Sequence, residues 1–165
     1  MNAVRTLLLS TYELGRQPFG LASPAAWLRR AGAEVRVRDL SRQRLEEHEV
    51  GTADVVAFYL PMHTATRLAL PALDRVRALN PRARLAAYGL YAPANGALLR
   101  ARGVTGVFGA EFEADLVAFV TEGDGVDGGD SSGRTSPNTI PRLDFLVPDR
   151  DGLPPLDRYA TLPDG

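Results

Sequence analysis

The residues with the clearest potential for ligand chemistry follow hydrophobic segments that we predict to be β-strands. Their side chains are mostly small or aromatic, and they include one imidazole and one carboxylate. These candidate ligand-binding residues are Ser10, Thr11, Tyr12, Gly15, Pro61, Met62, His63, Tyr88, Gly89, Leu90, Tyr91, Gly109 and Glu111. Because so few of them carry charge, they suit a large, flat, mostly neutral ligand better than a polyphosphate.

The composition excludes several classes of catalytic site. Cysteine is absent, which excludes a disulfide, a thiol nucleophile, and a zinc ion or iron–sulfur cluster held by cysteines of this chain. All 19 basic residues are arginine, so a Walker-type phosphate loop and a Schiff-base lysine are excluded as well. We also find no acid–base pair and no nucleophile with an adjacent base that would define a catalytic residue.

The charge and the hydropathy limit the possible partners. The net charge of −1 gives no indication of binding to nucleic acid or to an anionic membrane. No apolar run approaches the roughly 20 residues that span a bilayer. We therefore expect a cytoplasmic protein.

Three common ligands of α/β proteins lack their sequence motifs here. A dinucleotide site needs G-x-G-x-x-G after the first strand, where this chain has STYELG at 10–15. A phosphoacceptor receiver needs an aspartate after the third strand and a lysine after the fifth, and neither is present. A flavin phosphate loop would be rich in Ser, Thr and Gly, but only Ser10 and Thr11 precede Tyr12.

The elements that must position these residues follow from hydrophobic periodicity. Strands are predicted at 4–12, 33–40, 54–60, 82–89 and 104–109. Helices are predicted at 24–31, 64–79, 92–103 and 112–120, with one short helical turn within 41–53.

Two prolines bear on the helix boundaries. Ser23 and Pro24 are predicted to be the N-cap and the first residue of the first helix. Pro71 lies inside the pattern that follows the third strand, so that helix is either kinked at Pro71 or begins just before it.

Alternating strands and helices with short connections predict a mostly parallel sheet covered on both faces. The pattern fits a flavodoxin-like, doubly wound five-stranded sheet of order 2-1-3-4-5, a Rossmann-like three-layer α/β sandwich. Residues 1–121 would form this domain. Residues 122–139 are predicted to be a flexible linker, and the proline-rich residues 140–165 an extended arm that lies on some other surface.

Several segments together resemble the N-terminal cobalamin (B12)-binding domain of B12-dependent radical S-adenosylmethionine (SAM) proteins. These segments are STYELGRQPFGLASPAAWLRRAG, YLPMHTATRLA, YGLYAPANGALL, FGAEFEADL and the tail PRLDFLVPDRDGLPPLDRYATL. The resemblance implies that the chain binds cobalamin, and that the tail leads to a radical SAM domain that is missing from this chain. A 4Fe–4S cluster and S-adenosylmethionine would belong to that domain, in cis or in trans, and the chain alone would not be catalytic.

The chain departs from other cobalamin domains because the loop after its first strand lacks the Asp-x-His-x-x-Gly motif, whose histidine ligates cobalt from below. Three roles are therefore open for His63. It could ligate the cobalt, or contact the cofactor or a propionamide arm without ligating the metal. The third possibility is that His63 or Thr64 only caps the following helix. His48 lies among charges and is expected to be a solvated surface residue.

Other side chains also leave two interpretations. Tyr88 and Tyr91 could form a wall for the corrin beside Gly89, or pack as ordinary residues at a strand end. A bulky residue at Gly89 would then block corrin entry and leave the fold intact. Glu111 and Glu113 suit a helix start whatever the function. A solvated face is the simplest interpretation of three further acids, Glu46, Glu47 and Glu49.

Two other functions remain open at this point. The chain could be a degenerate flavodoxin-like domain that binds a partner protein and no cofactor. It could also bind a different small ligand in the same crevice.

Overall fold

The computed structural model describes residues 2–123 and 145–161, and these residues form a five-stranded sheet. The strands are β1 (Arg5–Ser10), β2 (Glu34–Asp39), β3 (Val55–Tyr59), β4 (Arg84–Tyr88) and β5 (Gly106–Phe108). All neighbouring strands pair in parallel, in the order β2-β1-β3-β4-β5. The predicted flavodoxin-like order is therefore confirmed.

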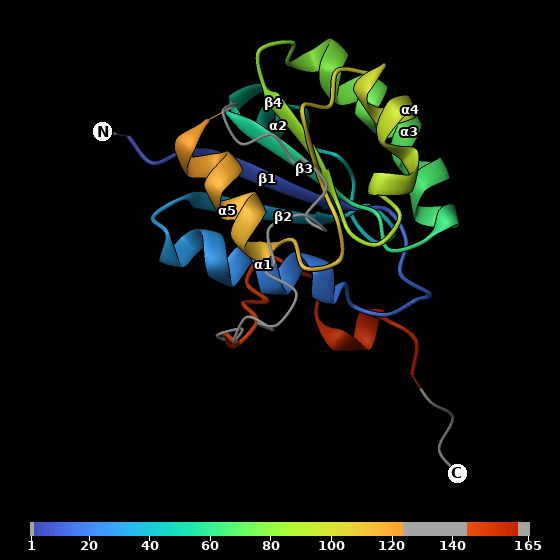
Figure 1. The fold of residues 1–165 in the computed structure, drawn as a ribbon. Helices are drawn as coiled ribbons and strands as arrows, with labels where there is room; N and C mark the ends of the chain where they lie inside the picture. The colour runs from blue at the N-terminus through green and yellow to red at the C-terminus, as the bar shows by residue number, and fades with distance from the viewer. Residues whose placement is uncertain (1, 124–144, 162–165) are drawn as a thin grey trace, which may run out of the picture.

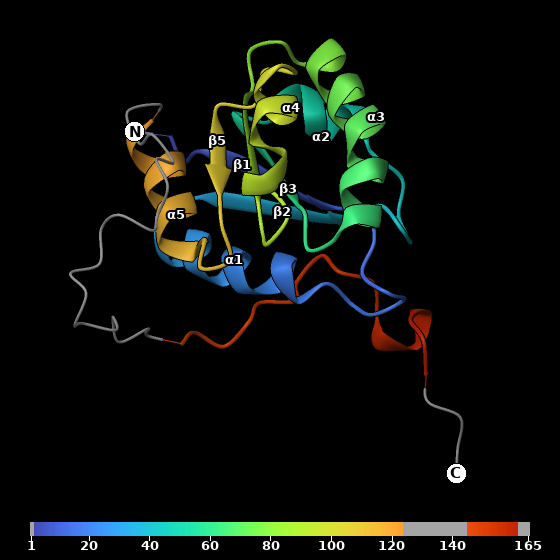
Figure 2. The ribbon, with the colours of Figure 1, turned by 45° about the vertical axis from the view of Figure 1, so that its right-hand side comes forward.

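Helices cover both faces of the sheet (Figures 1 and 2). On one face lie α1 (Phe19–Arg30) and α5 (Glu113–Glu122), and on the other lie α2 (Glu47–Thr52), α3 (His63–Leu79) and α4 (Gly96–Arg100), the last preceded by the 3₁₀ turn η1 (Pro93–Asn95). Two hydrophobic clusters fill the spaces between the layers. The central strand β3 contributes to both, which explains why its sequence is continuously apolar.

The first helix begins earlier than the sequence indicated. α1 starts at Phe19 with Pro18 as its N-cap, so Ser23 and Pro24 lie inside the helix and the predicted cap is wrong. Ser23 instead donates a hydrogen bond from Oγ to Oε1 of Glu113 at 2.8 Å, which joins α1 to the start of α5. A proline inside a helix leaves the carbonyl four residues earlier without its usual donor. In α1 that carbonyl belongs to Gly20.

The helix after β3 and the helix after β4 also differ in part from the prediction. α3 runs through Pro71 as one helix from His63 to Leu79, and Pro71 lies on its exposed side. The segment predicted as one helix at 92–103 divides into η1 and the short α4, and it ends at Gly103 with φ of +85°.

The tail lies on the domain itself. Residues 145–161 run along α1 and past the end of β2, and they include one 3₁₀ turn, η3 (Leu156–Arg158) (Figure 2). The Asp149 backbone N–H donates to the Ala22 carbonyl at 2.9 Å, and the Asp149 carboxylate pairs with Arg29 at 2.6 Å. Further along, the Ala160 N–H donates to the Gly15 carbonyl at 2.9 Å. The tail therefore reaches the loop that follows β1. The linker predicted at 122–139 lies mostly outside the described residues.

Candidate functional site

The last residues of the five strands form one row across the sheet. Strand register aligns Asp39 with Ser10, Ser10 with Tyr59, Tyr59 with Tyr88, and Tyr88 with Phe108. Aligned residues of neighbouring strands point to the same face of a sheet. Leu8, two residues before Ser10, packs in the cluster on the face covered by α1 and α5. The row, which we call the carboxyl-end row, therefore faces α1 and α5.

Tyr88 is completely buried in this row. Its hydroxyl donates to the Gly20 carbonyl at 2.8 Å, which is the carbonyl that Pro24 leaves without a helical partner. Burial, reinforced by nearby Tyr59 and Glu113, raises the pKa of Tyr88 well above its ordinary value, so it stays protonated and can donate. Tyr88 is a packing residue here and does not border an open groove.

Aromatic rings fill the space between the strand ends and the two helices. The ring centroids of Tyr88 and Phe112 lie 4.6 Å apart, and those of Tyr59 and Tyr88 lie 5.5 Å apart. The Tyr59 ring lies against Gly20, where an added Cβ would come within 2.2 Å of it. The crevice expected between the ends of the first, third and fourth strands is therefore closed below its rim.

Gly89 serves the chain's own packing. Its φ is +109°, and a Cβ at this position would lie 2.9 Å from the Leu60 carbonyl oxygen. A side chain there is strained in conformation and meets backbone, which cannot move aside easily. The expectation that a bulky residue at Gly89 would leave the fold intact is therefore wrong.

His63 is the first residue of α3, and its side chain is exposed. The N-cap of α3 is Met62, and no side chain makes a capping hydrogen bond at this end. Of the three roles open for His63, capping of this helix by His63 or Thr64 is therefore not observed. The exposed imidazole remains available to a ligand at the rim of the sheet.

The structure divides the predicted site residues into two groups. Ser10, Thr11, Tyr88 and Gly89 are buried. The others are exposed or half-buried at the loops after the strands, and we call them the rim: Tyr12, Gly15, Pro61, Met62, His63, Leu90, Tyr91, Gly109 and Glu111. Within the buried group, Thr11 Oγ1 donates to the Ala65 carbonyl at 2.7 Å and so ties the end of β1 to α3.

The sequence analysis missed Glu13, which lies in the loop directly after β1. Desolvation, reinforced by the negative charge of Asp39, raises the pKa of the half-buried Glu13 carboxyl to about 7. Its Oε2 atom and the Ser10 hydroxyl are both buried, and neither has a hydrogen-bond partner among the described residues. The available signal was a carboxylate placed within a short loop directly after a buried strand.

Asp39 and Tyr159 were also missed. Asp39 is fully buried and accepts hydrogen bonds from the Ser41 hydroxyl at 2.6 Å and from the Tyr159 hydroxyl at 2.8 Å. The guanidinium of Arg42 lies over the Tyr159 ring, 5.7 Å from its centroid. The tail thus supplies one donor to the carboxyl-end row.

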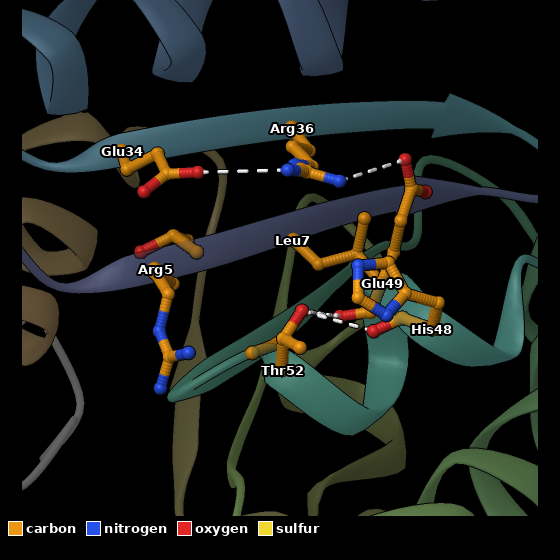
Figure 3. A pocket seen from close by; sticks show the side chains of 9 residues that line it. Arg5, Leu7, Glu34, Arg36, His48, Glu49 and Thr52 are labelled. Carbon is orange, nitrogen blue, oxygen red and sulfur yellow. Dashed lines mark hydrogen bonds and ion pairs between the residues drawn. The ribbon is translucent and has the colours of Figure 1, made fainter.

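A hollow of about 180 Å³ lies at the opposite side of the domain, beside the amino-terminal halves of β1 and β2 and α2 (Figure 3). Arg36 reaches from β2 toward Glu34 and toward Glu49, at 3.7 and 3.5 Å. Glu49 also accepts two bonds from Arg38, at 2.6 Å from Nε and 2.5 Å from Nη2. We call this the amino-end hollow.

Glu49 is buried, so the prediction that it belongs to a solvated face is wrong. Arg38 and Arg36 hold the pKa of the Glu49 carboxyl below its ordinary value. Glu46 and Glu47 are exposed as expected, and Glu47 pairs with Arg75 at 2.8 Å. His48 is exposed at the border of the hollow.

The described residues contain neither a metal-binding cluster nor a membrane-spanning helix. Residues 2–123 and 145–161 contain no group of three or more His, Asp or Glu side chains that could hold a metal ion. None of the helices within these residues is long and apolar enough to cross a membrane.

The fold and the carboxyl-end row define a flavodoxin-like α/β domain with a largely uncharged rim. Neither the protein-family models nor the curated protein sequences contain a match to this chain.

Proposed function

We propose that this domain binds cobalamin at the rim of its sheet and serves a radical SAM domain, in cis or in trans, in the cytoplasm. The observation that supports this proposal best is the exposed, largely uncharged surface formed where β1, β3 and β4 end side by side. In doubly wound sheets, ligands bind at the carboxyl ends of the strands where the strand order reverses, which here is between β1 and β3.

The residues present fit a corrin at the rim and not within the sheet. The interior position is closed by Tyr59, Tyr88 and Phe112. At the rim, Leu90 is 66% exposed and Tyr91 37% exposed, and the Met62 side chain is half-buried. These apolar side chains suit the face of a large ring, since covering them removes apolar surface from water.

Within this proposal, the chain's own residues position the cofactor. Cobalamin, when bound, would carry a methyl group or tune the radical chemistry of the partner domain. Met62, Leu90 and Tyr91 would cover the ring and exclude water from it. His63 would contact the ring or ligate cobalt, because its imidazole is exposed and makes no hydrogen bond to the described residues.

Binding can be tested with the purified chain and hydroxocobalamin. After mixing and desalting, we expect the wild type to keep the corrin absorption bands at about one equivalent. Leu90→Arg should lower the affinity at least tenfold by placing a long charged side chain on the rim. Leu79→Arg is the matched control. Leu79 is also an exposed leucine, but it is the last residue of α3, whereas the rim lies at the first residue of that helix, His63. Loss of all corrin from the wild type would contradict the proposal.

A second candidate is a protein-interaction domain without a cofactor. The observation in its favour is that Phe145 and Val147 of the tail are 90% and 89% exposed. Neighbouring side chains of the tail and α1 border a shallow hollow that includes Ala26, Leu146 and Val147. If the wild type keeps no corrin after desalting, this candidate becomes the better account.

A further inference from the structure

The loop that joins β1 to α1, residues 11–18, carries part of the rim and has an uncommon backbone conformation. Tyr12 and Gly15 of this loop belong to the rim. Leu14, between them, has φ of +50°, in the left-handed region that residues other than glycine seldom adopt. A conformation of this kind persists only where surrounding contacts hold it. The shape of this part of the rim therefore depends on contacts from outside the loop.

The tail supplies such contacts at two positions of the loop (Figure 2). The Ala160 N–H donates to the Gly15 carbonyl at 2.9 Å, and a Cβ added at Gly15 would lie 3.3 Å from the Cβ of Ala160. The side-chain amide of Gln17 donates from Nε2 to the Pro154 carbonyl at 2.9 Å. Its Oε1 accepts from Nη1 of Arg150 at 2.5 Å. The tail therefore holds the loop from the side that faces away from α3.

The tail itself is fastened by a single buried side chain. Among residues 145–161, Tyr159 alone is buried, and its hydroxyl donates to Asp39 at 2.8 Å. Leu153 is half-buried against the hydrophobic cluster under α1 and α5. An element with few buried apolar contacts opens at a lower free energy than the core of the sheet. The tail should therefore detach and reattach while the sheet stays folded.

Detachment of the tail would change the loop as well. Ala160 follows Tyr159 directly, so release of the Tyr159 anchor also frees the N–H that Gly15 accepts. A ligand that contacts the loop would bind the attached and the detached forms with different affinities. By linkage, a ligand that prefers the attached form also keeps the tail in place.

We propose that the tail is a positioning element of the rim: Tyr159 anchors it, and Ala160 holds the loop between β1 and α1 in the conformation that a rim ligand binds. This inference rests on the proposed function for the identity of the ligand. It deepens that function by making the affinity of the rim depend on attachment of the tail.

The first experiment is hydrogen exchange in the full chain without a ligand. The reporter is the Arg16 amide, which closes the turn by donating to the Glu13 carbonyl at 2.8 Å. In Tyr159→Ala, which removes the anchor, we expect this amide to exchange at least tenfold faster than in the wild type. Amides of β3 should keep their protection, which would show that the sheet remains folded. Phe145→Ala is the matched control, because it removes an aromatic ring of the tail that is 90% exposed.

A second variant removes one hydrogen bond and leaves the anchor in place. Ala160→Pro lacks the N–H that donates to the loop, and Tyr159 before it is extended, with φ of −108° and ψ of 174°, which allows a following proline. We expect the Arg16 amide to exchange at least threefold faster in this variant. Thr161→Pro is the control, because the Thr161 N–H makes no hydrogen bond within residues 2–123 and 145–161.

The third experiment measures the linkage with hydroxocobalamin. We expect Tyr159→Ala to bind at least fivefold more weakly than the wild type, and Tyr159→Phe, which keeps the anchoring ring, less than threefold more weakly. In the wild type, saturating hydroxocobalamin should slow exchange of the Ala160 amide at least threefold, because coupling between two events is reciprocal. A tail that only stabilises the fold would leave both quantities unchanged.

The outcomes separate this inference from the proposed function. If the wild type binds no corrin, the proposed function falls, whereas faster exchange of the Arg16 amide in Tyr159→Ala still supports the hold of the tail on the loop. If corrin binds but Arg16 exchange is unchanged in both Tyr159→Ala and Ala160→Pro, the inference alone falls. Equal affinity of the wild type and Tyr159→Ala for hydroxocobalamin would also overturn it, since the rim would then not depend on the tail.

Discussion

The carboxyl-end row and the amino-end hollow differ in a way that surface shape alone would not reveal. The hollow is the clearer depression, but its buried acid is satisfied, since Glu49 is bonded to Arg38 and lies within ion-pair distance of Arg36. The row is closed by aromatic rings, yet Ser10 and Glu13 hold buried oxygens without partners among the described residues. The two regions therefore differ in how their buried polar atoms are paired as well as in shape.

The largest loss of stability is expected from a side chain added at Gly89, where the loop after β4 lies close to the backbone of Leu60. Gly89→Val should destabilise the domain by about 3 kcal/mol, since it combines positive φ with a clash against the Leu60 carbonyl. Urea unfolding monitored by circular dichroism measures this loss. Gly51→Val is a control for glycine replacement, because a Cβ at Gly51 meets open space. Equal stability of Gly89→Val and the wild type would contradict the close approach of these strands' ends.

The next largest loss of stability is expected at Glu49, the buried acid of the amino-end hollow that is paired with Arg38 and Arg36. Glu49→Gln should cost about 2 kcal/mol at pH 7, less than for a fully enclosed ion pair because both arginines are partly exposed. The folded-state pKa of Glu49 is lowered, so its contribution is present above the unfolded pKa and is lost as the pH falls through the folded pKa. The difference between wild type and variant should therefore vanish in acid. His48→Ala, an exposed neighbour, should change stability by less than about 0.5 kcal/mol.

Glu13, in the loop beside the carboxyl-end row, should change stability with pH in the opposite direction to Glu49. The folded-state pKa of Glu13 is raised to about 7, so the charged form opposes folding. Stability attributable to Glu13 should fall as the pH rises from the unfolded pKa through about 7, and it should then stay constant. At pH 8, Glu13→Gln should stabilise the free domain by about 1 kcal/mol, after discounting for the half-exposed side chain. Unfolding curves at pH 5 and pH 8 test this, and a destabilised variant at pH 8 would remove the contrast between the two regions.

The smallest effect concerns the tail. Tyr159→Phe removes the donor to Asp39 and should cost about 0.5 kcal/mol, because the tail can detach without unfolding the sheet. Hydrogen exchange should show faster exchange of the Ala160 and Asp149 amides, while amides of β3 stay protected. Unchanged exchange at Ala160 would mean that the backbone bonds to Gly15 and Ala22 hold the tail without Tyr159.

The architecture was predictable because its signals are local. Continuous apolar runs gave the strands, the charged residues alternating in EVRVRD identified an edge strand, and short connections required parallel pairing. The start of α1 was missed because Pro24 suits a first helical turn in general. Its position inside the helix depends on the distant Tyr88, which supplies the donor to Gly20.

The candidate site was predicted only as a location. The residues after β1, β3 and β4 do lie together at one edge, but sequence alone could not show that Tyr59 would turn inward against Gly20. Nor could it show that Glu13 would be desolvated beside Asp39, because this depends on the register of β1 and β2 and on a loop with Leu14 at positive φ. Burial and pairing are properties of the folded chain, so these roles became visible only in the structure.

The residue types at positions 24 and 88 depend on each other in this arrangement, because both determine which donor reaches the Gly20 carbonyl. With proline at position 24, the Gly20 carbonyl requires an outside donor, and tyrosine at position 88 provides it. With a residue that has its own N–H at position 24, the helix would supply the donor itself, and phenylalanine at position 88 would serve equally well. Aligned homologues should therefore show covariation between these two positions, with proline accompanying tyrosine.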